Sequence, residues 1–513
     1  MKKIILALTV FANCTVMMSQ TEFDALKYTQ KDINGTARYM GMAGAFGALG
    51  GDASSIKDNP AGLGIYRKSE FVGTMNVMMQ NTNANKNGTI GYGDLYKTGA
   101  NNFSIVLAIP TWRNDSQTEG LLSSNFSFSY NRLKNFNRSL NVKSDSTTSS
   151  LTDYMGYFTG SISPADLTYT NSYEPFDNTD VPWISVMALE GKLITQNGSS
   201  WTSLLNRSIG NNEKVLPSYF LTEKGYIDEY SMGWAGNYNN KFYFGVTANI
   251  KAINYTAINK YGENFGSGGG LNLLDTVSTK GNGINMNLGA IYRPNNFLRF
   301  GLSVHVPTIY KLEDNYYSKL NFDAFEKGYI KAPDGSSIYQ LQEPWQINLS
   351  GALIVGKKGL LSAEYAFTNF TDTRLMGEFG DSQEFNDENA GMKDMLNDVR
   401  TLKIGGEYKL NDNFSVRGGF ANSSSATKTN AVKLMRYNTV RTDTEYFLQN
   451  SINYLSAGFG YREANWFVDF AYMHKILDES FYPYNSNALT LKADPAKVLT
   501  TTDNLVITLG LKF

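Results

Sequence analysis

Residues 402–410 read Leu-Lys-Ile-Gly-Gly-Glu-Tyr-Lys-Leu, with an apolar or small residue at every second position. This period of two places Leu402, Ile404 and Tyr408 on one face of a β-strand and Lys403 on the other. The same alternation recurs along the chain. We predict fourteen strands, at 69–79, 101–110, 122–133, 226–237, 242–258, 281–293, 297–312, 342–355, 359–375, 398–410, 413–427, 447–461, 465–480 and 501–513.

Short turns and long polar loops alternate between these strands. The short turns are 239–240, 294–296, 356–358, 411–412 and 462–464. The long connections are 80–100, 134–225, 259–280, 313–341, 376–397, 428–446 and 481–500. Short turns on one side, long loops on the other and an even number of strands are typical of bacterial outer-membrane barrels. A secreted β-sandwich also alternates, but it explains neither this rhythm nor the aromatic-rich apolar face.

The sequence therefore predicts an all-β protein, a fourteen-stranded antiparallel transmembrane β-barrel over residues 69–513. Lipid offers no hydrogen-bond partners, so the first strand must pair with the fourteenth. The chain ends on the aromatic residue Phe513. This ending resembles the signal by which the barrel-assembly machinery recognises its substrates, so we expect that machinery and outer-membrane lipid as partners.

Composition and the N-terminus agree with export to the outer membrane. Lys and Arg number 46 against 47 Asp and Glu, so the chain lacks the basic surplus of a nucleic-acid-binding protein. A basic start and the apolar run 4–12 predict a cleaved signal peptide over residues 1–19. Cys14, the only cysteine, lies within it. A lipoprotein anchor at Cys14 is the alternative, but residues 11–13 form a poor lipobox.

Residues 20–68 do not alternate, and they predict a compact helix-and-turn segment ahead of the barrel. Glycine occupies every third position from 41 to 50. A short motif follows directly before the first strand, formed by Asn59, Pro60, Ala61 and Gly62. A phosphate-binding loop is the alternative, yet neither of its glycine patterns is present. Small apolar residues of this kind are also not typical of a solvated linker.

The Gly/Ala-rich stretch, Gly-Asp-Ala at 51–53 and Asn-Pro-Ala at 59–61 resemble the N-terminal hatch of the FadL-type outer-membrane transporters. The resemblance extends from the hatch to the C-terminus. It implies that residues 20–68 plug the lumen from the periplasmic side. It also implies that long-chain fatty acids or other hydrophobic molecules diffuse inward when the hatch moves, through a lateral gap in the wall. Haemin and aromatic hydrocarbons are alternative ligands, and a general small-solute porin is a further alternative.

If the apolar faces contact lipid, the alternate positions face the lumen. The candidate ligand contacts in that register are Lys251, Arg299, His305, Lys403 and Arg417. An inward cation can hold a ligand carboxylate by a charge-assisted hydrogen bond. Alternatively, these charges pair with inward carboxylates and with the hatch. Arg38 in the hatch is the candidate latch, through a salt bridge, and His305 is also a candidate haem ligand.

Two further features bear on function. Loop 134–225 is rich in apolar and aromatic residues, which indicates either a surface groove that captures hydrophobic ligand or a folded cap with its own core. Pro307 lies within a predicted strand and is a candidate kink in the wall, with a strand end as the alternative. The sequence has two histidines and no Gly-x-Ser-x-Gly elbow, so we expect no enzyme activity, no metal site and no cofactor.

Overall fold

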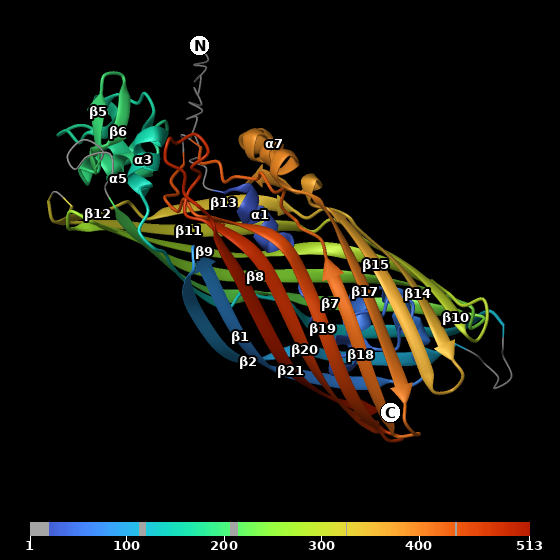
Figure 1. Ribbon diagram of the computed structural model, residues 1–513. Helices are drawn as coiled ribbons and strands as arrows, with labels where there is room; N and C mark the ends of the chain where they lie inside the picture. Colours follow the sequence, from blue (N-terminus) through green and yellow to red (C-terminus); the bar gives the residue numbers. More distant parts are fainter. Residues whose placement is uncertain (1–19, 112–118, 206–213, 325, 437–438) are drawn as a thin grey trace, which may run out of the picture.

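The computed structural model describes residues 20–111, 119–205, 214–324, 326–436 and 439–513, and the predicted signal peptide lies outside these ranges. Within them, nineteen strands form one antiparallel sheet, and β1 pairs along its length with both β2 and β21. This pairing closes the sheet into a barrel (Figure 1). The prediction that the first strand pairs with the fourteenth is confirmed.

Several of the nineteen strands are pieces of one spanning strand, so the barrel has the predicted fourteen. They are β1 (Glu70–Lys86), β2 (Thr89–Pro110), β3 (Leu121–Asn135) continued by β4 (Arg138–Lys143), β7 (Val215–Tyr238), β8 (Phe242–Phe265), β9 (Gly270–Tyr292), β10 (Leu298–His305) continued by β11 (Ile309–Phe322), β13 (Gly335–Gln342) continued by β14 (Gln346–Val355), β15 (Gly359–Asn369) continued by β16 (Arg374–Gly377), β17 (Asp398–Lys409), β18 (Phe414–Ser423), β19 (Tyr446–Arg462), β20 (Trp466–Tyr482) and β21 (Ala496–Lys512). The short β12 (Gly328–Lys331) pairs with β11 beyond the wall.

The strands are longer than predicted at the end that carries the long loops, called here the loop end. The predicted loop 80–100 is wrong, because β1 and β2 run on to a tight turn at Asn87 and Gly88. The predicted loop 259–280 is likewise mostly strand, with a turn at 266–269 between β8 and β9. β8 has 24 residues, whereas about 9–11 cross a bilayer, so these strands project beyond the membrane.

The outer face of the barrel is apolar in the predicted register. Leu402, Ile404 and Tyr408 are exposed, whereas Lys403 and Glu407 are buried. The same division holds on neighbouring strands and forms the band that faces lipid. Among the described residues, no helix is both long enough and apolar enough to cross a bilayer.

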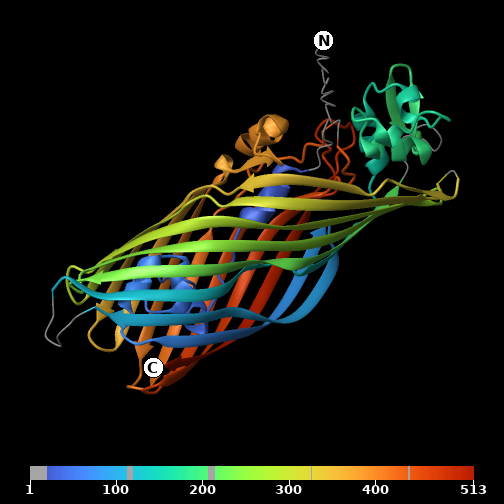
Figure 2. The ribbon, with the colours of Figure 1, turned by 180° about the vertical axis from the view of Figure 1, so that it is seen from behind.

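Residues 20–68 lie inside the barrel and are called here the hatch. They form the helices α1 (Glu22–Thr29) and α2 (Ala37–Met40) and the 3₁₀ turns η1 (Ala53–Lys57) and η2 (Pro60–Ile65). α1 contacts the loop-end helix α7 (Asn386–Met395), whereas Ser69 exchanges backbone hydrogen bonds with Phe513 at the opposite, turn end. The hatch therefore extends along the lumen from one end to the other, and does not sit at the turn end alone (Figures 1 and 2).

The long connection between β4 and β7 folds into a cap at the loop end. The extended β4 and β7 shorten the predicted loop 134–225 to residues 144–214. Its described elements are α3 (Leu151–Thr159), α4 (Pro164–Leu167), η3 (Pro175–Asp177), α5 (Trp183–Glu190), β5 (Ile194–Asn197) and β6 (Ser200–Ser203). Met155, Trp183 and Ile184 are buried in a core continuous with that of the upper barrel. Of the two interpretations of this loop, the folded cap is the one observed, and the capture groove stays a prediction.

Candidate functional site

Glycines on the barrel wall allow the hatch backbone to lie directly against the strands. A Cβ at Gly289 would come within 2.0 Å of Asn59 Oδ1, and one at Gly245 within 2.5 Å of the Pro60 carbonyl oxygen. Gly419 on β18 packs in the same way against the backbone of Met42. Only glycine permits such close backbone approach, so the wall is shaped to the hatch.

The Asn-Pro-Ala-Gly motif fixes the end of the hatch nearest the first strand. Asn59 Oδ1 accepts a hydrogen bond from the Ala61 amide at 3.1 Å and so caps η2, where Pro60 holds the first helical position. Asn59 Nδ2 donates to the Gly47 carbonyl at 2.6 Å and to the Ala290 carbonyl on β9 at 3.3 Å. One side chain thus links two hatch segments to the wall.

Arg38 joins the hatch to a buried charge network on β17, β18 and β20. Its Nε donates to Glu407 Oε2 at 2.8 Å, and its Nη2 donates to Oε1 at 3.1 Å. Glu407 also accepts from Arg417 Nε at 2.6 Å, and Arg417 Nη1 donates to Asp469 at 2.6 Å. Such bidentate pairing is strong and directional. Arg38 therefore has the salt bridge expected of a latch, and the latch role itself stays a prediction.

Asp58 is the centre of a second network between hatch and wall. Its carboxylate accepts from Tyr39 and lies 3.5 Å from Lys57 Nζ and 3.6 Å from Lys403 Nζ. Burial alone would raise the pKa of Asp58, but Lys57 and Lys403 hold it well below its usual range. Asp58 is therefore ionised, and it ties the turn-end half of the hatch to β17 by charge.

All five predicted lumen residues face inward, and each has a protein partner. Lys251 Nζ donates to Glu343 at 2.7 Å, and Lys403 Nζ donates to Glu364 at 2.8 Å. Arg299 donates to the Leu49 carbonyl at 2.7 Å, and His305 Nε2 lies 2.9 Å from the Asp58 carbonyl. Their contacts correspond to the alternative in which the charges pair within the protein. Binding of a ligand by any of them stays a prediction.

Several cavities adjoin the hatch inside the barrel. One of about 280 Å³ lies at the turn end, between Gly50 and Ile65 of the hatch and Arg299 and Lys409 of the wall. Two chambers lie farther toward the loop end. The upper chamber, of about 210 Å³, lies between α1 and the wall and is lined by residues that include Lys27, Lys134, Phe136, Tyr219 and Tyr255. The lower chamber, of about 150 Å³, is lined by nine ionisable residues besides tyrosines, namely Lys31, Asp32, Lys57, Asp58, Glu229, Lys251, His305, Glu343 and Lys403. Both chambers share the hatch residues 30–32, so they adjoin along the hatch.

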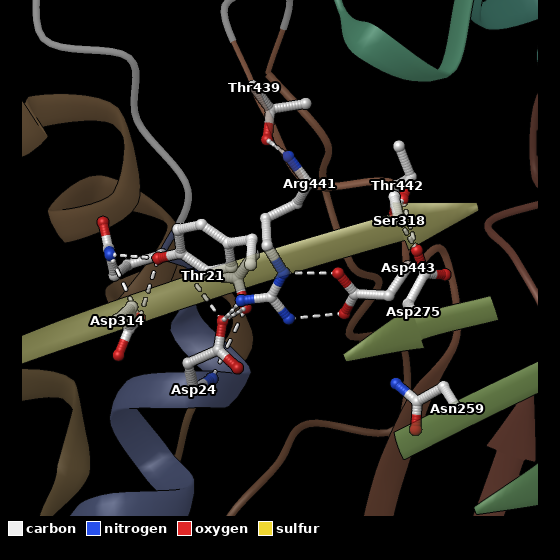
Figure 3. Close-up of polar contacts among 12 residues, drawn as sticks. Thr21, Asp24, Asn259, Asp275, Asp314, Ser318, Thr439, Arg441, Thr442 and Asp443 are labelled. Atoms are coloured by element: carbon white, nitrogen blue, oxygen red, sulfur yellow. Dashed lines mark hydrogen bonds and ion pairs between the residues drawn. The ribbon is translucent and has the colours of Figure 1, made fainter. Parts of the chain in front are cut away.

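Residues 424–445, between β18 and β19, fold into the barrel mouth and contact α1. Arg441 donates to both carboxylate oxygens of Asp443 and also lies 3.4 Å from Asp24 on α1 (Figure 3). Nearby, Arg436 lies 3.4 Å from Glu22 on α1 and 3.3 Å from Glu388 on α7. This inward loop, which sequence patterns did not reveal, holds the loop end of the hatch.

The wall is interrupted at two places. The ladder between β2 and β3 ends at the pair Asn102 and Asn131. Within the part of the chain that the structure describes, residues 89–101 of β2 therefore have no ladder partner on that side. Pro307 lies in the break between β10 and β11, beside the matching break at Pro344 between β13 and β14. The strand end is the alternative observed at Pro307, and a kink of the wall stays a prediction.

Comparisons with known proteins show which family has this architecture. A family profile described as "Outer membrane protein transport protein (OMPP1/FadL/TodX)" matches residues 14–513. The chain belongs to this family. Membership places it among outer-membrane transport proteins and accounts for a closed barrel with an internal N-terminal segment. A search of curated proteins found no match.

Solved structures of FadL-type proteins share the fold. A FadL homologue from Pseudomonas aeruginosa is 13% identical with a TM-score of 0.54, and the toluene transporter TodX from P. putida is 12% identical with a TM-score of 0.52. Each alignment covers 94% of this chain and 99% of the other. At such identity the likeness shows the architecture alone, so ligand preference must come from this chain's own residues.

Proposed function

We propose that this FadL-family protein takes up hydrophobic molecules by passive diffusion, gated by the hatch. Long-chain fatty acids are the ligands that the resemblance implied. Aromatic hydrocarbons are equally compatible, because one relative of the same fold is named a toluene transporter. The observation that carries the proposal is a hatch that fills the lumen and is bound to the wall by ion pairs and close backbone contacts.

The filled lumen favours a gated transporter over a general porin. The cavities beside the hatch have volumes of about 280, 210 and 150 Å³ and have different linings. A porin needs a continuous water-filled channel, which wide barrels leave open when nothing plugs them. Here the charges of the wall bind the hatch, so solute passes only when these contacts break.

The unpaired stretch of β2 supports lateral release into the membrane. Gly99 and Asn101 of β2 and Arg132 and Asn135 of β3 line a small cavity of about 40 Å³ at this place, which also contacts the hatch. Without a hydrogen-bond ladder, the two strands can separate at lower cost than elsewhere in the wall. A hydrophobic molecule released here would enter the bilayer without crossing water.

Haemin is disfavoured as the ligand. His305 is buried, and its Nε2 lies 2.9 Å from the Asp58 carbonyl oxygen on the hatch. Axial ligation of iron would require that nitrogen to leave its hydrogen-bond partner and the hatch to move aside. The aromatic and fatty-acid alternatives require hatch movement alone.

The test locks the hatch to the wall. Gly41 and Gly458 face each other, since a Cβ at either would lie 3.3 Å from the other's Cα. We expect purified Gly41→Cys/Gly458→Cys protein in liposomes to admit palmitate or toluene when reduced and to lose this uptake when oxidised, with sucrose excluded in both states. The matched controls are the wild-type protein under the same two conditions and each single cysteine variant, which add the same close contacts without a disulfide. Equal uptake in both states, or free passage of sucrose, would contradict gating by the hatch.

A further inference from the structure

Among the described residues, one cation of the upper chamber has no carboxylate within salt-bridge distance. Its lining includes seven basic side chains, Lys27, Lys31, Lys134, Arg138, Lys433, Arg441 and Lys475. Six of them have a carboxylate within 4.0 Å of a side-chain nitrogen. Lys134 has none among the described residues, and its Nζ donates to the Lys27 carbonyl at 2.8 Å. Its close partner is a neutral carbonyl oxygen, so an anionic group can approach Lys134 without displacing a carboxylate.

The chamber as a whole favours negative charge. Its lining includes six carboxyl groups, those of Asp24, Asp32, Glu223, Asp443, Glu445 and Glu479, against the seven cations. Burial, reinforced by the neighbouring Asp443 carboxylate, raises the pKa of Glu445 to about 8, so this carboxyl remains protonated at pH 7. The buried Nε of Arg138 also has no hydrogen-bond partner among the described residues. The Lys134 ammonium on β3 and the Arg138 Nε on β4 are thus available to an anionic group.

Aromatic rings surround Lys134. Its Nζ lies 5.1 Å from the centroid of Phe136, whose ring packs edge-on against Tyr255 with centroids 4.9 Å apart. Tyr219, Tyr446 and Phe447 line the same chamber. Rings of this kind bind other rings by offset or edge-on packing, which is favourable beyond the area that it buries. The surface next to the cation therefore suits a flat apolar group.

The volume limits the size of the ligand. The chamber of about 210 Å³ is smaller than the roughly 300–1,000 Å³ of pockets that hold drug-sized molecules. An extended acyl tail would have to continue into the lower chamber, where it would displace water from nine ionisable residues. Removing water from such groups without replacing their hydrogen bonds is costly. A compact ring system fits the upper chamber without that cost.

We infer that the upper chamber is a binding site for a compact aromatic carboxylate, with Lys134 as the anchor for the carboxylate and the Phe136–Tyr255 pair as the surface for the ring. The site rests on the proposed function, since it would hold the ligand on its way through the plugged lumen. It narrows the ligand class, because a neutral hydrocarbon would leave Lys134 without a counter-ion and a long acyl chain would exceed the chamber.

Binding to detergent-purified protein tests this inference separately from transport. The probe is 2-naphthoate, compared with its neutral isostere 2-naphthamide and with palmitate by isothermal titration calorimetry. We expect saturable 2-naphthoate binding that is at least tenfold tighter than that of 2-naphthamide, since a hydrogen bond to a charged group contributes about that factor. Equal affinity for the acid and the amide would overturn the inference. Tighter binding of palmitate than of 2-naphthoate would overturn the assigned ligand class.

The variant Lys134→Met keeps the apolar stem and removes the charge, and we expect it to weaken 2-naphthoate binding at least tenfold while leaving 2-naphthamide unchanged. Lys134→Arg should restore most of the affinity. The matched control is Lys97→Met on β2, an exposed lysine whose loss changes the net charge equally. Heat-dependent gel migration checks that each barrel is folded. Unchanged naphthoate binding in folded Lys134→Met would overturn the site even if the hatch-locking experiment supports transport.

Discussion

At the residue scale, charge pairs decide how firmly the hatch is held. Glu407 accepts from Arg38 of the hatch and from Arg417 of the wall, and Arg417 is also paired with Asp469. Because Glu407 keeps Arg417 when Arg38 is absent, the wall does not acquire an isolated buried charge. Loss of Arg38 should therefore free the hatch more than it destabilises the barrel.

The first prediction concerns Arg38→Ala. We expect the hatch to dock more weakly by about 1–3 kcal/mol, the usual effect of removing one partner of a buried hydrogen bond. Openings in planar bilayers should become about tenfold more frequent, while the unfolding temperature of the barrel changes little. The control is Arg400→Ala, because Arg400 is exposed and pairs with Asp398 at the surface. An unchanged frequency of openings in Arg38→Ala would contradict a latch role for Arg38.

The sequence predicted which wall residues face the lumen, but not what they contact. Period-two alternation was sufficient for Lys251 and Lys403, because each lies in an uninterrupted strand. Their partners depend on the course of the hatch and on distant strands. Lys134 was missed because the predicted strand ends at 133 and Lys134 was assigned to the following loop, whereas β3 continues to Asn135. A bulge between Arg132 and Lys134 also shifts the register of β3 against β7. A single extra residue turns the following side chains to the other face, and no local pattern marks it here.

At the element scale, the wall glycines and the hatch backbone form one close-packed interface. Gly405 on β17 and Gly419 on β18 both lie against Met42, and Gly301 on β10 lies against Gly47. These contacts involve backbone atoms, which cannot rotate away as a flexible side chain can. A methyl group at such a position must displace the hatch itself.

Gly419→Ala should therefore loosen the hatch. Its new Cβ would lie 2.4 Å from the carbonyl carbon of Met42, and we expect docking to weaken by about 1–3 kcal/mol. A cysteine introduced at the buried Ala45 reports on this, because a thiol reagent reaches it only when the hatch moves. Modification should be faster in Gly419→Ala and unchanged in Gly351→Ala, where a Cβ meets nothing within 4 Å. Equal rates in the two variants would speak against the interface.

Strand existence was predictable, and strand length was not. A strand inside the bilayer has one lipid face, so alternation marks it clearly, as in β17 and β21. The upper parts of β1 and β2 stand in water on their outer side, and residues 80–86 are mostly polar on both faces. Nothing in that composition separates strand from loop, which explains the error at 80–100. The composition of the hatch motif, in contrast, was informative, because close backbone packing requires glycine.

At the scale of the whole molecule, the hatch is held at both ends by different kinds of contact. Glycine packing and the Asp58 and Glu407 networks bind its turn-end half. The inward loop 424–445 and α7 bind α1 at the loop end, through Arg441 and Arg436. A ligand that arrives from the loop end first meets the contacts of Arg441 and Arg436 with α1. Release of α1 can therefore precede movement of the rest of the hatch.

This arrangement makes the loop-end contact sensitive to pH. Glu22 on α1 is buried against α7, with Arg436 at 3.4 Å and with Glu388 and Asp24 as like charges nearby. Burial raises the pKa of Glu22 to about 7, although Arg436 opposes the shift. A carboxyl whose pKa is higher when docked than its ordinary value of about 4.5 binds more protons in the docked state. The free energy that favours docking of α1 should therefore decrease as the pH rises from about 4.5 to about 7. Above about pH 7 it should no longer change.

We accordingly expect more frequent channel openings at pH 8 than at pH 5.5, measured in planar bilayers at constant salt. Glu22→Gln should lose most of this pH dependence, because its amide does not titrate. Burial also raises the pKa of Glu388, so any slope left in Glu22→Gln should vanish in Glu22→Gln/Glu388→Gln. The matched control is Glu326→Gln, which removes an exposed carboxyl paired with Lys192. A pH dependence that survives in the double variant would assign the sensitivity to groups elsewhere in the lumen, and the hatch would then be released from its turn end.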